Sequence, residues 1–204
     1  MLMPELRYDV VRAGIALYGL WPSEETRLLM ISRGQNLLNL LQDEDLQQRG
    51  VHSLLSSFLQ PAMTFKTRVT QVKEVPVDWS IGYGCTYRTR RHTRIAVLPM
   101  GYADGYDRRL SNGGQVLIRG MRAPVVGRVS MNLTTVDVTD IAGVTTGDEV
   151  VLLGHQGSEE VSAEELAERI GTINYEVVTR IRWDLPRLYR AGPEPAVEAP
   201  APGG

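Results

Sequence analysis

The feature that most constrains the fold is a series of short runs between Pro61 and Leu153 in which apolar and polar residues alternate. The runs are rich in β-branched residues, and no helical segment separates one run from the next. Glycine-rich turn signals lie between them, and strands joined by short turns pair antiparallel because a parallel pair needs a long crossover. We therefore predict a mainly β fold, an antiparallel barrel or sandwich with a few short helices. The strand candidates are residues 64–75, 93–100, 114–120, 122–131, 134–140 and 148–154.

One helix is predicted directly after this region. The stretch Ser162-Ala163-Glu164-Glu165 has the pattern of a capping box, and Gly171 is a typical stop, so the helix should run from Ala163 to Ile170. A second short helix is expected to start at Thr172.

The two remaining segments have other compositions. Residues 24–60 carry leucines three and four apart, interrupted by Gly34 and Gly50, which indicates a helical insertion or connection. Residues 191–204 are rich in proline and are predicted to be disordered.

Composition argues against several functional classes. The 204 residues carry a net charge of -2, which provides no basic field for nucleic acid, and no apolar run approaches the ~20 residues that span a bilayer. A single cysteine, Cys85, excludes an internal disulfide, and no metal site is expected. Because the first residues lack the regions of a secretory signal, a cytoplasmic location is expected.

Two glycine-rich segments are candidates for chemistry. Glycines on both sides of Tyr83 free the backbone, so the phenol could face a ligand; the alternative is a strand-end bulge with a packed tyrosine. The segment from Met100 to Arg109 places two tyrosines and two arginines in a loop that could steer an anionic small molecule. A surface turn with solvated arginines is the alternative for this second segment.

Two weaker signals concern a phosphate. Arg12 lies two residues before Gly14, whose neighbours could offer backbone N–H groups to a phosphate, although an ordinary strand-end turn has the same pattern. Tyr175 follows a helix stop, where its hydroxyl could either bind a phosphate or pack in the core.

Taken in order, these segments resemble the alanine racemase family. The resemblance covers about three quarters of the chain and rests on Val11 to Gly19, Phe65 to Val69, Tyr83 to Tyr87, Gly101 to Tyr106, Ala123 to Met131, Gly147 to Val150, Thr172 to Glu176 and Pro186 to Tyr189.

The resemblance implies an architecture and an activity. Family members pair an N-terminal (β/α)8 barrel with a C-terminal β domain and form head-to-tail homodimers that use pyridoxal 5'-phosphate to interconvert L- and D-alanine for the cell wall. By this likeness residues 1–23 are a remnant of the barrel, with its last strand in residues 1 to about 20. Residues 24–60 are an insertion or connection longer than the usual link, residues 61–190 are the β domain, and residues 191–204 are a tail.

Site residues follow from the same resemblance. Tyr83 matches the catalytic tyrosine, which exchanges the α-proton on one face of the substrate in the partner subunit's site. The cofactor-binding matches are Arg12 at the pyridine nitrogen and Gly14, Ile15 and Tyr175 at the phosphate; the substrate-binding matches are Met131 at the carboxylate and Tyr102, Arg108 and Ile173 in the entry corridor. Asn132 departs from the aspartate often found there, which alters the charge of the entrance.

The lysine that forms the Schiff base with the cofactor has no match in this chain. Lys66 and Lys73 are the only lysines, and seven residues apart on one strand they would point to opposite faces. We therefore expect a racemase fragment that is inactive without an N-terminal barrel portion or a second subunit. The alternative is a non-catalytic β module that binds a racemase subunit or another protein. The motif of related barrel-fold decarboxylases is not seen around Cys85.

Overall fold

The computed structural model describes residues 14–41, with side chains as far as Arg33, and residues 59–190. The chain divides into two compact units, Met1–Met63 and Thr64–Gly204, and each is described by itself. Arg12 and the tail 191–204 lie outside the described residues.

The first unit contains two described helices. Gly14–Tyr18 forms a 3-10 helix, η2, where the resemblance implied a strand end. Helix α1, Glu24–Leu41, lies in the predicted helical segment and continues through Gly34 without the expected interruption. Tyr18 and Gly19 lie close to the end of the unit, since the Ala62 N–H donates to the Tyr18 carbonyl at 2.9 Å.

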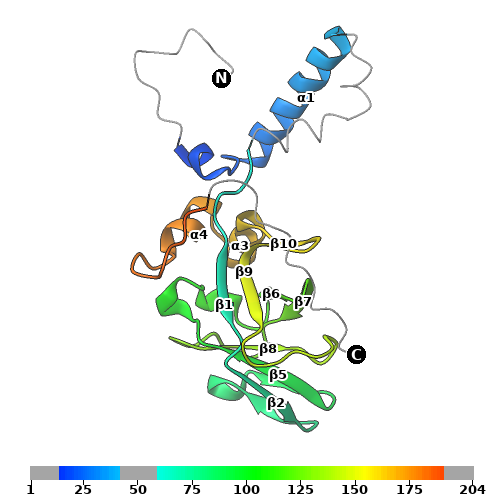
Figure 1. Cartoon of the computed structure of the whole chain (residues 1–204), viewed down its shortest axis with the longest axis vertical. Helices are drawn as coiled ribbons and strands as arrows, with labels where there is room; N and C mark the ends of the chain where they lie inside the picture. The colour runs from blue at the N-terminus through cyan, green and yellow to red at the C-terminus, as the bar shows by residue number, and fades with distance from the viewer. Residues whose placement is uncertain (1–13, 42–58, 191–204) are drawn as a thin grey trace. The chain divides into compact units, whose positions relative to one another are not determined.

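The second unit is built from antiparallel sheets, which confirms the predicted mainly β fold (Figure 1). Its largest sheet has the order β1-β9-β6-β7, with β10 also paired to β9, a second sheet has the order β2-β5-β8, and β3 pairs with β4. No closed barrel forms among the described strands. The strands are β1 (Phe65–Arg68), β2 (Gln71–Val75), β3 (Ser80–Ile81), β4 (Tyr87–Arg88), β5 (Thr93–Leu98), β6 (Gln115–Ile118), β7 (Met121–Pro124), β8 (Thr134–Asp137), β9 (Glu149–Gln156) and β10 (Glu159–Val161).

Strands β6 and β9 form the centre of the core. Leu117 pairs with Val151 and Ile118 with Val150, and all four side chains are completely buried. Burying a side chain of this kind contributes about 1.5–3 kcal/mol. The consecutive apolar residues of these strands reflect burial on both faces.

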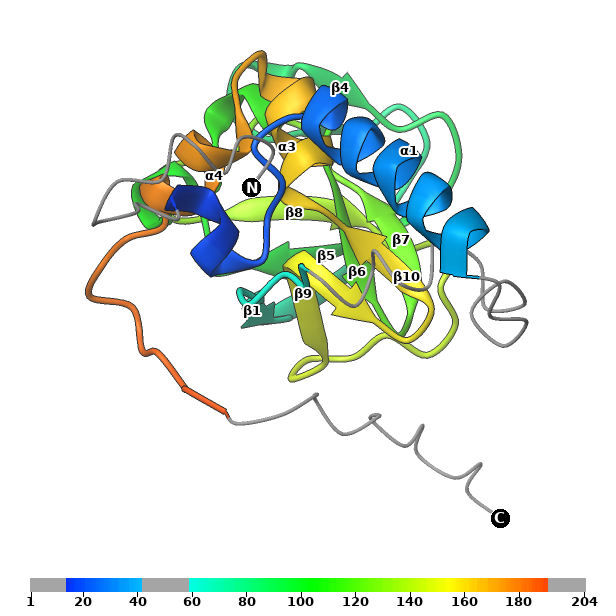
Figure 2. The same cartoon turned by 90° about the horizontal axis from the view of Figure 1, so that it is seen from above.

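Two helices cover one end of this unit, away from the three-stranded sheet (Figure 1). Helix α3, Ala163–Ile170, has the predicted bounds, because the Ser162 hydroxyl accepts a hydrogen bond from the Glu165 N–H at 3.1 Å and Gly171 ends it with φ of 68°. Helix α4, Asn174–Arg180, follows at once, and Figure 2 shows the two helices side by side.

The predicted strand 64–75 is two strands in different sheets. The Val69 N–H donates to the Asp148 carbonyl, whereas the next N–H, that of Thr70, donates to the Val97 carbonyl, each at 2.9 Å. The backbone changes partner between these residues. Lys66 and Lys73 therefore lie on different strands, and the prediction that they share one is wrong.

The predicted strand 122–131 is also shorter than expected. It ends at Pro124 in β7, and the chain continues as a loop in which Gly127 has φ of 81°. A left-handed residue of this kind interrupts a pleated strand.

Candidate active site

Tyr83 lies between β3 and β4 on a short 3-10 helix, η3, Tyr83–Cys85. Gly82 and Gly84 flank it with φ of 74° and 72°, a region that glycine enters without steric cost. Ile81 is buried in a cluster on the three-stranded sheet, but η3 buries no residue and Tyr83 is 76% exposed. The packed-tyrosine alternative is therefore wrong for this unit. Cys85 is also exposed.

An arginine, Arg128, lies beside the same loop. A Cβ built on Gly82 would lie 3.1 Å from the backbone nitrogen of Arg128, and one built on Gly84 would lie 3.6 Å from its side-chain Nε. Within the described residues the Arg128 guanidinium forms no hydrogen bond or ion pair. The sequence predicts no role for Arg128. The available signal is Gly127 directly before it, since a Cβ there would lie 2.8 Å from the Ile81 carbonyl oxygen.

Tyr102 and Met131 lie on two loops that are bonded together. Tyr102 begins the 3-10 helix η4, Tyr102–Asp104, and its N–H donates to the Ser130 carbonyl at 3.0 Å; the Ala103 N–H donates to the Met131 carbonyl at the same distance. A Cβ on Gly101 would lie 2.2 Å from the Ser130 oxygen, so only glycine permits this approach.

Met131, whose backbone N–H is predicted to bind the substrate carboxylate, is exposed on this loop. Met131 is 55% exposed, and its N–H has no acceptor in the part of the chain that the structure describes. The neighbouring Asn132 is also exposed. A free N–H on an exposed loop is suited to an anionic ligand.

The two arginines that follow Asp107 have different environments. They begin the 3-10 helix η5, Arg108–Leu110, and the Asp107 carboxylate caps it by accepting from the Arg109 N–H at 2.8 Å. The Arg109 guanidinium bonds back to Asp107, and this hydrogen bond holds the pKa of Asp107 below its ordinary value. Arg108 is exposed and has no such partner among the described residues, so the solvated-arginine alternative stands for it.

Helix α4 presents two further predicted residues. Ile173 precedes it and is 59% exposed, and Tyr175 in its first turn is 37% exposed, while Val177 and Val178 are buried. The core-packing alternative for Tyr175 therefore holds only in part.

The end of helix α4 is tied to the Tyr102 loop. Arg182 forms an ion pair with Asp104 at 3.0 Å, and a Cβ on Gly105 would lie 2.6 Å from the Arg180 carbonyl oxygen.

Tyr106, in the same motif as Tyr102, lies in the interior. It is 2% exposed, and its hydroxyl is buried without a hydrogen-bond partner within the described residues. Burial raises the pKa of Tyr106 well above its ordinary value, so the phenol stays protonated at neutral pH.

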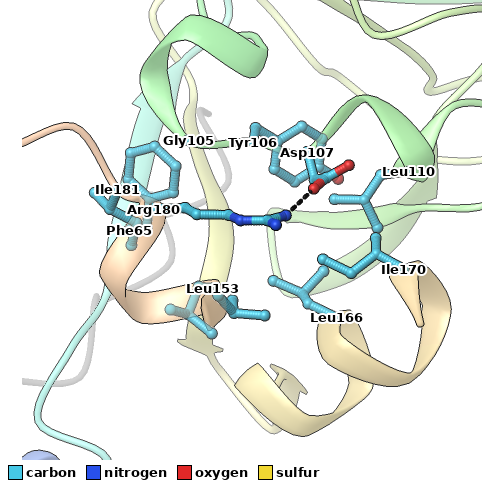
Figure 3. Close-up of a pocket in the computed structure, with 11 residues that line it drawn as sticks. Phe65, Gly105, Tyr106, Asp107, Leu110, Leu153, Leu166, Ile170, Arg180 and Ile181 are labelled. Atoms are coloured by element: carbon cyan, nitrogen blue, oxygen red, sulfur yellow. Dashed lines mark hydrogen bonds and ion pairs between the residues drawn. The ribbon is translucent and has the colours of Figure 1, made fainter. Parts of the chain in front are cut away.

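A small apolar pocket adjoins Tyr106 (Figure 3). Side chains of β1, β9, η5, α3 and α4 line it, and Arg180 reaches across it to Asp107 at 2.5 Å. Its interior has room for little more than one water molecule, and none of the predicted site residues lines it. The pocket is a packing defect between the helices and the sheet.

The two lysines lie on strands of different sheets. Lys66 on β1 forms an ion pair with Glu149 on β9 at 3.2 Å. Lys73 lies on β2, opposite Ile95 of β5.

The remaining predicted residues belong to the first unit. Gly14 has φ of 60° and open space around a built Cβ, and Ile15 is buried. Arg12 is outside the described residues. No group of three or more metal-ligating side chains occurs in residues 14–41 and 59–190. No helix in those ranges has both the length and the apolar character to cross a membrane.

Comparisons with known proteins all point to one family. A family model for the C-terminal domain of alanine racemase matches residues 62–189. The alanine racemase of Symbiobacterium thermophilum is 48% identical over 189 residues, which cover 93% of this chain and 43% of that protein. The alanine racemase of Leptospira interrogans is 42% identical over 188 residues, 92% of this chain and 43% of that protein.

A solved structure gives the same result. The alanine racemase of the D-cycloserine producer Streptomyces lavendulae matches with a TM-score of 0.73 and 35% identity, over 93% of this chain and 43% of that chain. The chain thus spans less than half the length of the relatives that it matches.

Proposed function

The chain belongs to the alanine racemase family, whose C-terminal domain it matches, and from this premise we propose that it supplies the tyrosine side of an active site that interconverts L- and D-alanine. Its proposed place is the cytoplasm, where the D-alanine would enter cell-wall synthesis. The observation that carries the proposal is the exposed phenol of Tyr83, with the guanidinium of Arg128, unpaired within the described residues, beside its loop.

The residues of this chain divide the work at the substrate. Tyr83 would remove or return the proton at Cα on one face, as a general base or acid within hydrogen-bond reach. The free N–H of Met131 would hold the substrate carboxylate and so orient Cα. Tyr102, Arg108 and Ile173, all exposed, would line the approach, and the positive charge of Arg108 would attract the substrate carboxylate.

The cofactor would be pyridoxal 5'-phosphate, which serves as an electron sink for the negative charge left at Cα. Gly14 and Ile15 begin η2, and their N–H groups, which have no partner within the helix, would bind the phosphate. Tyr175 would add a hydroxyl to the phosphate, and Arg12 would bond the pyridine nitrogen.

The covalent anchor of the cofactor would come from another polypeptide segment. Lys66 is engaged by Glu149, and Lys73 lies in a different sheet. A lysine-bearing barrel portion and a second subunit in a head-to-tail homodimer are the proposed partners.

A chimera tests the proposal. The chain is joined to the part of the Symbiobacterium thermophilum relative that it does not span, and the conversion of L- to D-alanine is measured with pyridoxal phosphate added. We expect racemisation by the chimera and none by the 204-residue chain alone. In the chimera, Tyr83→Phe should lower kcat at least about 100-fold.

Tyr189→Phe is the matched control, because Tyr189 is another strongly exposed tyrosine and lies outside the site. Full activity of Tyr83→Phe would refute the assignment of the base. Racemisation by the chain alone would refute the assignment of the anchor to another segment.

A non-catalytic module is the second candidate, favoured by the engagement of Lys66 in the sheet. It predicts a folded chimera that binds pyridoxal phosphate and does not racemise alanine.

A further inference from the structure

The Tyr83 loop, residues 82–86, forms few internal interactions. Its 3-10 helix has no side-chain cap and buries no residue, and its internal bond, from the Cys85 N–H to the Gly82 carbonyl, is long at 3.3 Å. A base held this loosely would not keep the geometry that proton transfer needs, because a displacement of about 1 Å can cost 100-fold in rate. The loop therefore needs an external support.

Asn112 provides a link from outside the loop. Its Nδ2 donates to the hydroxyl of Thr86, the residue that ends η3, at 3.2 Å. This is the one side-chain hydrogen bond that reaches residues 82–86 from another segment of the described chain. Asn112 has φ of 58°, a conformation that asparagine adopts more readily than most residues.

The same asparagine holds the loop of Arg128 and Met131. Asn112 Oδ1 accepts from the Gly127 N–H at 2.7 Å, and the Asn112 N–H donates to the Gly127 carbonyl at 3.2 Å. Both polar groups of the Gly127 backbone are thus bonded to one residue.

Ser111 completes the arrangement on the other side of Arg128. Its hydroxyl accepts from the Val129 N–H at 3.0 Å and donates to the Arg108 carbonyl. The residues on both sides of Arg128 are therefore fixed by two successive residues that follow the helix of Arg108.

We infer that Asn112 is a positioning residue for the Tyr83 base: it locks the Tyr83 loop to the loop that carries Arg128 and Met131. This inference rests on the proposed function. Asn112 acts through Thr86 and Gly127, and the reaction would depend on it through the placement of the phenol.

Asn112→Gly is the informative variant, because glycine keeps the positive φ and the backbone bond and removes only the side chain. Arg119→Gly is the matched control: Arg119, in the turn between β6 and β7, also has positive φ, at 52°, and its side chain bonds to Asp148, the residue before β9. Asn112→Asp should rescue, since its second oxygen can accept from the Thr86 hydroxyl.

The first measurement is amide hydrogen exchange in the 204-residue chain. Peptides that cover residues 82–86 and 127–129 should exchange at least about fivefold faster in Asn112→Gly and remain unchanged in Arg119→Gly. Unchanged exchange in these peptides overturns the inference, whatever the chimera does.

The second measurement is kinetic, in the chimera. Asn112→Gly should lower kcat about 10- to 100-fold with KM changed less than about threefold, and Asn112→Asp should restore most of kcat. Unchanged kcat with faster exchange also overturns the inference. An inactive wild-type chimera refutes the proposed function instead, and hydrogen exchange then still decides whether Asn112 locks the loops.

Discussion

The Gly82–Thr86 loop and the Gly101–Tyr106 loop both place tyrosines among glycines, and they use the glycines differently. In the first, Gly82 and Gly84 allow left-handed turns that carry Tyr83 outward, to 76% exposure. In the second, glycines allow the backbone to approach other backbone, and Tyr106 enters the core. The comparison teaches that glycine around a tyrosine indicates close backbone geometry, while the fate of the ring depends on what the neighbouring strands bury.

The largest expected difference concerns the rings themselves. Tyr106→Ala should lower the free energy of unfolding by about 3–5 kcal/mol, since it empties a fully buried site. Tyr83→Ala should change it by less than about 0.5 kcal/mol. Urea denaturation of both variants measures the contrast, and equal losses would mean that Tyr83 is packed after all.

The second largest difference is expected in the stability cost of replacing a glycine in each loop. Gly105→Ala would combine positive φ with a Cβ 2.6 Å from a carbonyl oxygen, and should cost about 3 kcal/mol. Gly84→Ala shares the positive φ but meets no atom closer than 3.6 Å, so about 1 kcal/mol is expected. Thermal unfolding ranks the two; the reverse order would contradict the close approach at Gly105.

Low pH should remove a stabilising interaction next to the second loop, the one between Asp107 and Arg109. The hydrogen bond from Arg109 lowers the pKa of Asp107 in the folded state, so its stabilisation is present above the unfolded pKa, near ~4, and is lost as the pH falls through the folded value. Asp107→Asn should remove at most about 1 kcal/mol at pH 7, and this deficit should shrink as the pH falls. Denaturation curves at pH 7 and pH 2.5 for the variant and the wild type check this; an equal deficit at both values would mean that charge is irrelevant there.

The smallest effect on stability should come from removing the hydroxyl oxygen of Tyr106. The Tyr106 hydroxyl is buried with no partner in the described structure, so Tyr106→Phe should leave stability unchanged or raise it by up to about 1 kcal/mol. A loss of more than about 1 kcal/mol would reveal that the hydroxyl forms a hydrogen bond to a buried water.

Local signals predicted the parts of the fold that local physics decides. Ser162 and Gly171 fixed both ends of α3, because cap and stop act within one turn of helix. The alternating pattern identified the strands but not their ends. The switch of sheets at Val69 and Thr70 depends on partners 79 and 27 residues away, Asp148 and Val97, which no local pattern encodes.

The candidate site shows the same division. The glycines around Tyr83 left an accessible and a packed phenol both open, and the 76% exposure of the ring decides for the accessible one. The sequence predicts one strand over 122–131 and not the loop around Arg128, because the backbone of this loop is bonded to Ser111 and Asn112 of a separate turn. These polar side chains gave no signal in sequence beyond that of an ordinary turn.

The exposed Cys85 has a practical consequence. It is the only thiol in the chain and lies two residues from Tyr83, so a single maleimide-linked dye would report on this loop without background from any other position. Labelling should slow when a second polypeptide covers the loop, and the rate of that one reaction would then follow assembly in real time.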